Sequence, residues 1–354
     1  MNAVAARPAE PRGYWTRLAD PERDRAAVIA LWQRNLGDAS HRAEKFDWFY
    51  RSCPFGTPLL MLLYHDDALI GCSGVAPRRM RWRGNAVRAG LLADIAVDAS
   101  HRTLGPALML QQALIAAAAG QFDLLYGFPN RKSLPVATRL GYANIGELTR
   151  HSYVLRHTTY LRRYLPRWLA TPIGAVLDHT RMAVRACRQP RSNTVATWSE
   201  GVDPRMDALW QRPLPDAEPI GVRDTTTNRW RFDDCPLNHT RYLLLADHPE
   251  APLRAWFACQ VHGTVLRICS YWSDRGSTHV DASLVATLIH AARSSGHTSI
   301  SFAFSGCEAL AGSWQSAGFV ARESQPAIAK WLDHEPAGTN PDRPWFLTEA
   351  DEDE

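Results

Sequence analysis

Apolar runs alternate with amphipathic segments along the first half of the chain, and this pattern predicts a mixed α/β fold. A short strand around 14–18 precedes Asp20-Pro21-Glu22, which supplies an N-cap, a first-turn proline and an early acid for a helix that reaches about Asn35. Two further apolar runs, 59–64 and 68–75, are separated by polar residues and predict a β-hairpin.

The rest of this unit continues the alternation. Gly120 stands where a glycine commonly ends a helix, and Gly141 ends a second, shorter one. The remaining predicted elements are a helix over 43–51, a strand ending at 93–97, a helix over 105–119, a strand over 122–128, a short helix near 133–140 and a strand over 142–155. Together they are typical of a mixed sheet covered by helices.

The second half of the chain repeats the first in an ordered series of residues. At a constant offset of 182, Trp48, Tyr50, Cys53 and Pro54 correspond to Trp230, Phe232, Cys235 and Pro236. The apolar strand over 60–63 falls on 242–245 at the same offset, and Leu140-Gly141-Tyr142 matches Ala317-Gly318-Phe319 further on. Such a series indicates two copies of one fold.

We therefore divide the chain into four parts. They are an N-terminal domain over 1–155, a basic helical linker over 156–197, a second domain over 198–335 and an acidic C-terminal tail over 336–354. The run of acids at its end, Glu349–Glu354, is expected to be disordered.

The linker has eight arginines between 156 and 191 and a single acid, Asp178. Two interpretations stay open. The arginines either lie in solvent along a helical connection, or they belong to a basic amphipathic segment that makes peripheral contact with an anionic membrane. Pro166 and Pro172 are expected to break any long helix here.

Composition restricts the class of protein. The chain has 354 residues, and its formal net charge of +4 is too small to indicate a nucleic-acid partner. Seven widely spaced cysteines without a C-x-x-C pair favour reduced thiols over a disulfide framework or a metal site, and with them a cytoplasmic protein. The N-terminus lacks the apolar run of a signal peptide, and no stretch approaches eighteen apolar residues.

The most specific local pattern follows the strand that ends at 93–97. It contains Arg102-x-x-Gly105-x-Ala107, placed where a strand turns tightly into a helix. Gly105 allows the backbone to approach an anion closely. The free N–H groups of the first helical turn, assisted by the helix dipole, then point at a diphosphate.

This segment, DIAVDASHRTLGPALM, resembles the central strand, cofactor loop and helix of the GNAT acetyltransferase superfamily. FPNRKSLPVATRLGY is similar to the strand end, short helix and Leu-Gly-aromatic turn that follow in that family. The resemblance covers about 14–155. In the second half the equivalent segment, 271–280, lacks the R-x-x-G-x-[GA] pattern, so we expect two tandem GNAT-like domains of which only the first binds the cofactor.

The resemblance implies acyl transfer from acetyl-CoA to a primary amine, on a small molecule or an amino-sugar, by direct transfer in a ternary complex. Carried over by position, the backbone of Ile95, Ala96 and Val97 pairs with the pantetheine arm and thioester, and Asn130 reaches the pantetheine from the neighbouring strand. The diphosphate is held by N–H groups in the span Arg102, Thr103, Leu104, Gly105, Ala107 and Leu108. No metal is implied.

Asp94 is the candidate general base, because it interrupts an otherwise apolar strand beside the expected thioester. Its alternative role is to anchor a turn or a neighbouring Arg. The proton donor is less defined, because the family often has a tyrosine at the position of Ala137. Tyr126, Ser133, Tyr142 or water are the candidates that take its place.

Other features leave alternatives open. The run Arg78 to Arg83 predicts a solvated edge strand with alternating charge, or else a patch for an acidic acceptor or the CoA 3′-phosphate. Trp48, Trp82, Trp230 and Trp272 favour core packing over an acceptor cleft. Tandem folds of this kind also resemble Fem-type aminoacyl transferases and N-myristoyltransferases. A longer acyl chain, an aminoacyl donor and a non-catalytic CoA-binding scaffold at a membrane therefore remain alternatives.

Overall fold

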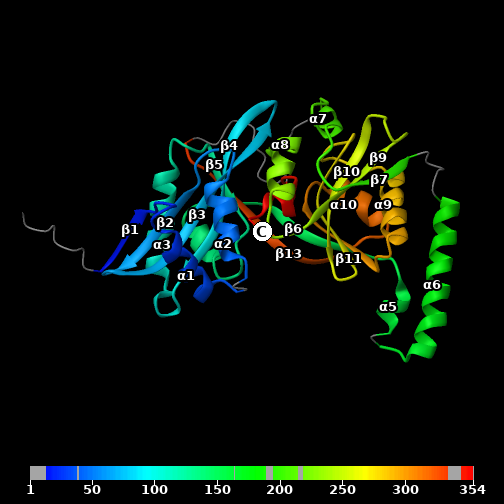
Figure 1. The fold of residues 1–354 in the computed structure, drawn as a ribbon, viewed down its shortest axis with the longest axis horizontal. Helices are drawn as coiled ribbons and strands as arrows, with labels where there is room; N and C mark the ends of the chain where they lie inside the picture. Colours follow the sequence, from blue (N-terminus) through cyan, green and yellow to red (C-terminus); the bar gives the residue numbers. More distant parts are fainter. Residues whose placement is uncertain are drawn as a thin grey trace, which may run out of the picture.

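The structure is a computed structural model that describes residues 13–37, 40–162, 164–188, 194–213, 218–333 and 344–353. Two α/β lobes lie side by side, and a helical arm extends from the second (Figure 1). The first lobe contains β1 (Tyr14–Leu18), α1 (Arg25–Asn35), α2 (Arg42–Phe46), the π-helical turn η1 (Asp47–Arg51), β2 (Leu59–His65), β3 (Ala68–Trp82), β4 (Asn85–Val97), η2 (Ala99–His101), α3 (Leu104–Ala118), β5 (Leu124–Gly127), α4 (Leu134–Arg139) and β6 (Ala143–Val154).

The arm and the second lobe follow. The arm is α5 (His157–Leu161) and α6 (Arg167–Arg188). The second lobe contains β7 (Val195–Ser199), α7 (Arg205–Trp210), β8 (Ile220–Gly221), α8 (Thr225–Asn228), the π-helical turn η3 (Arg229–Asp233), β9 (Thr240–Ala246), β10 (Leu253–His262), β11 (Val265–Ser273), α9 (Ala282–Ser294), β12 (Ser299–Ser305), α10 (Glu308–Ser316), β13 (Val320–Trp331), β14 (Leu347–Thr348) and η4 (Glu349–Asp351).

One continuous mixed sheet joins the two lobes. Within the described residues it has 14 strands, in the order β1-β2-β3-β4-β5-β13-β6-β12-β11-β10-β9-β7, with β14 on β12 and β8 on β3. The last long strand of each half is exchanged: β13 lies antiparallel between β5 and β6, and β6 in turn pairs with β12. Each half therefore completes the sheet of the other.

The sequence repeat appears in the structure as a repeated element order. The turns η1 and η3, which carry the matching aromatic residues, meet at the junction of the lobes. The rings of Trp48 and Trp230 stack with centroids 4.9 Å apart, and Trp48 Nε1 donates to the Trp230 carbonyl at 3.0 Å. Both side chains are buried, as is Trp272, so these tryptophans belong to the core.

Three expectations need correction. Arg78 to Arg83 does not form a solvated edge, because β3 pairs along this stretch with β4 and with β8, and Arg78, Met80 and Trp82 are buried. Pro172 lies inside α6 without ending it. The acidic end of the tail is ordered over its described residues: η4 spans Glu349–Asp351, and Glu349 and Asp351 are buried, since this segment packs between the lobes.

No helix in the described part of the chain is long and apolar enough to cross a membrane. The cysteines described there are all free.

Candidate functional site

Strands β4 and β5 separate after a short parallel pairing. They are paired only from Ala89 to Leu91 on β4, although β4 continues to Val97. We call the gap beyond Leu91 the first wedge. The backbone groups of β4 that face β5 here have no strand partner, so they are available to a ligand.

A β-bulge shapes this part of β4. The register against β3 shifts, so that Asp94 and Ile95 together stand opposite Ser73. Asp94 has a left-handed backbone with φ of +52°, which is uncommon for a residue other than glycine. A bulge re-aims side chains and interrupts the ladder, and strained residues of this kind cluster at functional sites.

A cavity of about 130 Å³ occupies the first wedge. Three residues predicted from the sequence line it, namely Asp94, Ile95 and Asn130. Ala137, Ser133 and Tyr142 also line it. The other lining residues are Ser73, Leu92, Ala93, Gln111, Gly127, Phe128, Pro129, Val136, Leu140, Ile328 and Asp353.

The N-terminus of α3 follows η2 at the end of β4. Its N-cap, Thr103, makes no side-chain capping hydrogen bond, and a Cβ on Gly105 would meet no atom within 4 Å. The Arg102 guanidinium fixes the preceding turn, because Nε donates to the Val97 carbonyl at 2.7 Å and Nη2 donates to Asn35 at 2.8 Å. The first turn of α3 is thus open to an anion.

The remaining residues predicted to hold the cofactor have the following surroundings. Leu104 is exposed, Ala107 and Leu108 are half-buried, and Ala96 and Val97 are buried in the core. For the last two only the backbone is available to a ligand. Asn130 accepts from the N–H groups of Lys132 and Ser133 through its side-chain oxygen, and so shapes the turn before α4.

Asp94 is held by two residues of the α2–η1 segment. Lys45 Nζ lies 2.9 Å from Oδ1, and the Tyr50 hydroxyl donates to Oδ2 at 2.8 Å. The Lys45 and Asp94 side chains are only 3% and 2% exposed, so the ion pair is almost fully desolvated. Burial, and then the Asp94 carboxylate, raises the pKa of Tyr50 well above its ordinary value. Asp94 therefore has the anchoring contacts that were its alternative role.

The C-terminal tail brings a second carboxylate to the same cavity. Asp353 lines the cavity, its side chain is 33% exposed, and Oδ2 lies 3.7 Å from Lys45 Nζ. No local pattern pointed to this residue, because it lies far from Asp94 along the chain. Only the packing of the tail reveals it.

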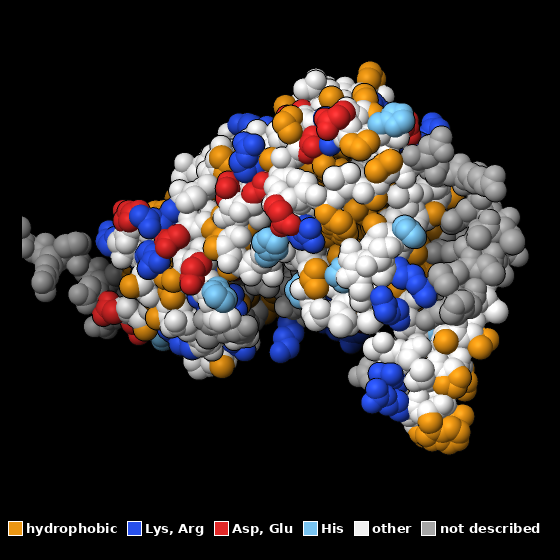
Figure 2. Space-filling view, turned by 45° about the vertical axis from the view of Figure 1, so that its right-hand side comes forward, with side chains coloured by type: hydrophobic (Ala, Val, Ile, Leu, Met, Phe, Trp, Pro, Cys, Tyr) orange, Lys and Arg blue, Asp and Glu red, His pale blue; other side chains and the backbone are white. Residues whose placement is uncertain are grey.

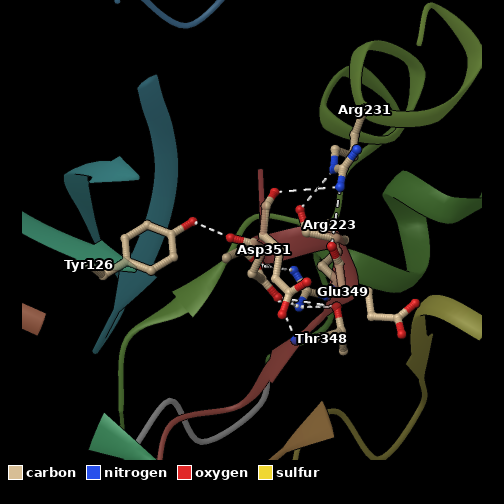
Figure 3. Close-up of polar contacts among 9 residues, drawn as sticks. Tyr126, Arg223, Arg231, Thr348, Glu349 and Asp351 are labelled. Carbon is tan, nitrogen blue, oxygen red and sulfur yellow. Dashed lines mark hydrogen bonds and ion pairs between the residues drawn. The ribbon is translucent and has the colours of Figure 1, made fainter. Parts of the chain in front are cut away.

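Two buried arginines fix the tail in place (Figure 3). Arg223 pairs with Asp351 at 2.6 Å, and Arg231 donates to the backbone carbonyls of Glu349 and Ala350. Asp351 also caps the η4 turn through Thr348. These contacts hold the chain that leads to Asp353.

The two tyrosines considered as proton donors lie in different places. The Tyr126 hydroxyl donates to the Asp351 carbonyl at 3.1 Å, and this side chain is not part of the lining of the 130 Å³ cavity (Figure 3). Tyr142 does line the cavity, and its buried hydroxyl has no hydrogen-bond partner. Burial raises the pKa of both phenols, so both stay protonated at neutral pH.

The second half contains the equivalent gap, but the tail fills it. Strands β11 and β12 pair only as far as Ile268 and Phe302, and we call the gap beyond them the second wedge. There β14 pairs with β12 at Phe304 and Ser305, and Phe346 packs against Trp272 with ring centroids 6.1 Å apart. The chain itself occupies the space that is open in the first half.

A mixed sheet whose fourth and fifth strands separate in front of a helix N-terminus is the architecture of the GNAT acetyltransferases. Residues 17–145 match the family model of the acetyltransferase (GNAT) domain. The match confirms the resemblance found in the sequence. A search of curated protein sequences gives no significant match.

Solved structures of the same fold cover both halves. A probable N-acyltransferase from Enterococcus faecalis aligns with a TM-score of 0.64 and 12% identity, over 90% of this chain and 72% of that chain. A GCN5-related N-acetyltransferase from Anabaena variabilis aligns with a TM-score of 0.61 and 11% identity, over 90% of this chain and 73% of that chain. Eis1 from Mycobacterium abscessus aligns with a TM-score of 0.56 and 12% identity, over 90% of this chain and 74% of that chain. At these identities the likeness establishes the fold.

Proposed function

We propose that this protein transfers an acetyl group from acetyl-CoA directly to a primary amine of a small molecule or amino-sugar. The observation that carries the proposal is the open backbone edge of β4 beyond Leu91, which borders a cavity and is followed along the chain by the uncapped first turn of α3. The amides of a pantetheine arm match such an edge, and a diphosphate matches such a helix start. When bound, acetyl-CoA supplies the thioester.

The size of the cavity supports a short acyl group. About 130 Å³ accommodates the end of a pantetheine arm with a small acyl group, whereas a fatty acyl chain needs a longer tunnel. The lining beside Asp94 is Ser73 and Gln111, joined by a hydrogen bond of 2.7 Å between Gln111 Nε2 and Ser73 Oγ. This polar patch suits a polar acceptor better than an alkyl chain.

The two carboxylates at the cavity, Asp94 and Asp353, have different roles toward the acceptor amine. Asp94 is held by Lys45 and Tyr50, and in our proposal it fixes the bulge. Asp353, which is more exposed and at a longer distance from Lys45, accepts the proton from the incoming amine. Tyr142, whose hydroxyl is buried and unpartnered, gives its proton to the departing thiolate in the place of the tyrosine absent at Ala137.

In this proposal the second lobe is a GNAT-like domain that does not bind a cofactor of its own. The repeated element order and the 90% coverage by tandem-sized GNAT structures support this. Its contribution is the tail, which runs from the second wedge to the cavity in the first. The cysteines, free in the structure, suit a reducing compartment such as the cytoplasm.

The test is a thiol-release assay with acetyl-, butyryl- and myristoyl-CoA against a panel of primary amines. Acetyl-CoA with at least one small amine is expected to release thiol, and Asp353→Asn is expected to lower kcat by about 10²-fold or more without a change in CoA affinity measured by calorimetry. Asp67→Asn, in the exposed β2–β3 turn, is the matched control. Thiol release that is unchanged in Asp353→Asn would remove this residue from the mechanism, and no CoA binding at all would remove the function.

A further inference from the structure

A second cavity, of about 20 Å³, lies at the junction of the two halves. Its lining comes from β3, β5, β8, α8, η3, β11, the loop after β8 and the tail. Six buried side-chain atoms of the lining residues have no hydrogen-bond partner: Arg78 Nε and Nη2, Arg79 Nε, Arg223 Nε, Trp230 Nε1 and Ser270 Oγ. Five of these six can only donate a hydrogen bond.

Arg78 is the cation with no anion. Its side chain is 7% exposed, and its guanidinium lies 4.7 Å from the ring centroid of Trp230 and 5.1 Å from that of Phe49. Its Nη1 donates to the Pro77 carbonyl, and no carboxylate of the described residues forms an ion pair with it. Burial lowers the pKa of Arg78, Arg231 acts in the same direction, and Asp353 opposes them only at longer range.

The neighbouring arginines do not share this condition. Arg79 pairs with Asp224 at 2.7 Å, and Arg223 pairs with Asp351 at 2.6 Å. Their charges are balanced inside the protein, so the acid at position 351 is already engaged. Arg231, which also lines the cavity, donates to backbone carbonyls of the tail. The charge of Arg78 requires a partner, because a buried cation without an anion is strongly destabilising.

An anion satisfies this lining better than water. A water molecule brings two protons of its own, for which a lining of donors offers few acceptors, and it leaves the charge of Arg78 uncompensated. A small anion accepts from several donors at once and neutralises the guanidinium. The cavity volume exceeds what one water needs and suits a single small ion or one carboxylate group.

We propose that this junction cavity is a binding site for a small anion, held by Arg78, Trp230 and Ser270. The ligand is a halide or a single carboxylate group. The site lies beside Trp48 and Trp230, where the two π-helical turns meet, so its occupancy strengthens the contact between the halves. It is separate from the acetyl-transfer function and does not depend on it.

The experiment compares thermal unfolding of the full chain in chloride, bromide and acetate against gluconate, at constant ionic strength. We expect a saturable rise in Tm of about 2–5 °C with a small anion in the wild type. The rise should vanish in Arg78→Met and persist in Arg322→Met, an exposed control. A response to halides alone identifies an inorganic ion, and a response to acetate alone identifies the carboxylate of an organic ligand.

Bromide soaked into crystals of the wild type gives a second readout that needs no variant. Anomalous density is expected in the cavity within hydrogen-bond distance of Arg78. An equal rise in Tm with anions in the wild type and in Arg78→Met overturns the proposal. So does a bromide-soaked crystal in which the cavity holds water and no bromide.

A different observation, on the α5–α6 arm, carries a second inference. Large apolar side chains are exposed there, with Trp168 at 74%, Tyr164 at 68% and Val176 at 62%. Ala170 and Gly174 are buried, and a Cβ on Gly174 would meet Thr158 within 2.5 Å, so α6 packs on α5 through that face. At 100° per residue, Trp168 and Val176 lie on the opposite face of the helix.

The charge of the arm indicates what covers this face. Arg156, Arg162 and Arg167 are exposed, and the sequence of the arm continues with further arginines. Figure 2 shows apolar side chains gathered at the lower tip of the molecule, next to Lys and Arg side chains. Trp and Tyr between arginines are typical of a helix that lies at the surface of an anionic bilayer.

We infer that the arm docks on anionic lipid. In sedimentation with vesicles, the protein should bind phosphatidylglycerol-containing vesicles at 0.1 M salt and leave pure phosphatidylcholine unbound. Replacing Trp168 and Val176 by Ser should weaken binding about 10-fold or more, while Val261→Ser, an apolar control in β10 that is 53% exposed, should not. Equal binding by the Ser variant, no binding to either vesicle, or a salt-independent self-association through the arm overturns the inference.

Discussion

The two halves of this chain share an element order but treat the gap beyond their paired central strands in opposite ways. In the first half the gap between β4 and β5 stays open and holds a cavity of about 130 Å³. In the second half the gap between β11 and β12 is closed by β14, with Leu347 fully buried. A ligand site and a structural seam thus arise from one architecture.

The residues around the bulges of β4 and β11 also differ between the two halves. Both β4 and β11 change register against the preceding strand, at Asp94 and at Cys269. At the offset of 182, the positions of Lys45 and Tyr50 correspond to Thr227 and Phe232. The first half thus keeps a buried Lys45–Asp94 ion pair, whereas the second half has a threonine and a phenylalanine at the corresponding positions. A buried pair costs desolvation, so we interpret its retention as a sign of function.

The largest predicted effect comes from removal of the strand that fills the second wedge. A chain ending at Arg343 loses Trp345, Phe346 and Leu347, all buried, and each contributes roughly 1.5–3 kcal/mol. That sum approaches the whole stability of a typical protein, so we expect a chain that is largely unfolded in urea-denaturation and circular-dichroism measurements. Leu347→Ala should lower the free energy of unfolding by about 2–5 kcal/mol. An unchanged urea midpoint in the shortened chain would show that the fold does not depend on the segment that fills the second wedge.

The next effect concerns the ion pair at the first bulge. Asp94→Asn removes the carboxylate 2.9 Å from the buried Lys45 ammonium, while Asp353 stays at 3.7 Å, and we expect a loss of about 3 kcal/mol in the free energy of unfolding. Combining it with Lys45→Met should recover part of that loss, because the uncompensated charge is gone. If the double variant is no more stable than the single one, the pair does not explain the effect.

A third prediction compares the N-termini of α3 and α9 as sites for the CoA diphosphate. Gly105→Glu places a negative charge and a side chain at the open first turn of α3, and CoA affinity should fall by at least about 100-fold in calorimetry. Ser283→Glu occupies the matching position in α9 of the second half and should leave affinity unchanged. Equal affinities for both variants would place the diphosphate elsewhere.

The smallest effect is a pH dependence in the tail. Burial, with the carboxylates of Glu349 and Asp353, raises the pKa of Glu352 to about 7. The folded protein therefore holds this proton more tightly than the unfolded chain, and the associated stability, full below about pH 4.5, is lost as the pH rises through 7. Glu352→Gln should be more stable than the wild type at pH 8 by on the order of 1 kcal/mol, with no gain at pH 4. Glu147→Gln, an exposed control, should show neither change.

Local pattern was sufficient for the corner that defines the family. The apolar strand, the Arg102–Ala107 spacing and the helix after it are contiguous, so their geometry follows from the order of a few residues, and Asp94 could be singled out as a polar residue in an apolar strand. Its partners could not be, because Lys45 and Tyr50 come from a helical segment that only tertiary packing brings to the bulge.

Features that depend on tertiary packing between distant segments could not be predicted from the sequence either. Periodicity identifies a strand over 142–155 but contains no information on which sheet it joins, so the exchange of β6 and β13 was not foreseen. The run from Arg78 to Arg83 was misinterpreted because charge suggests solvent. Arg78 is buried since β8, β4 and the tail cover it. Acidic composition likewise suggested a disordered tail, whereas Arg223 and Arg231 bind it.

The exchange of β6 and β13 has a consequence for the origin of this architecture. Half of the molecule taken alone would present β5 with an open edge, because the strand that covers it is supplied by the other half. Two copies of one ancestral half, trading their last strands as a swapped homodimer, would reproduce the same sheet. In a chain that arose by fusion of two such copies, the second half needs no cavity of its own, because its tail lines the cavity of the first half.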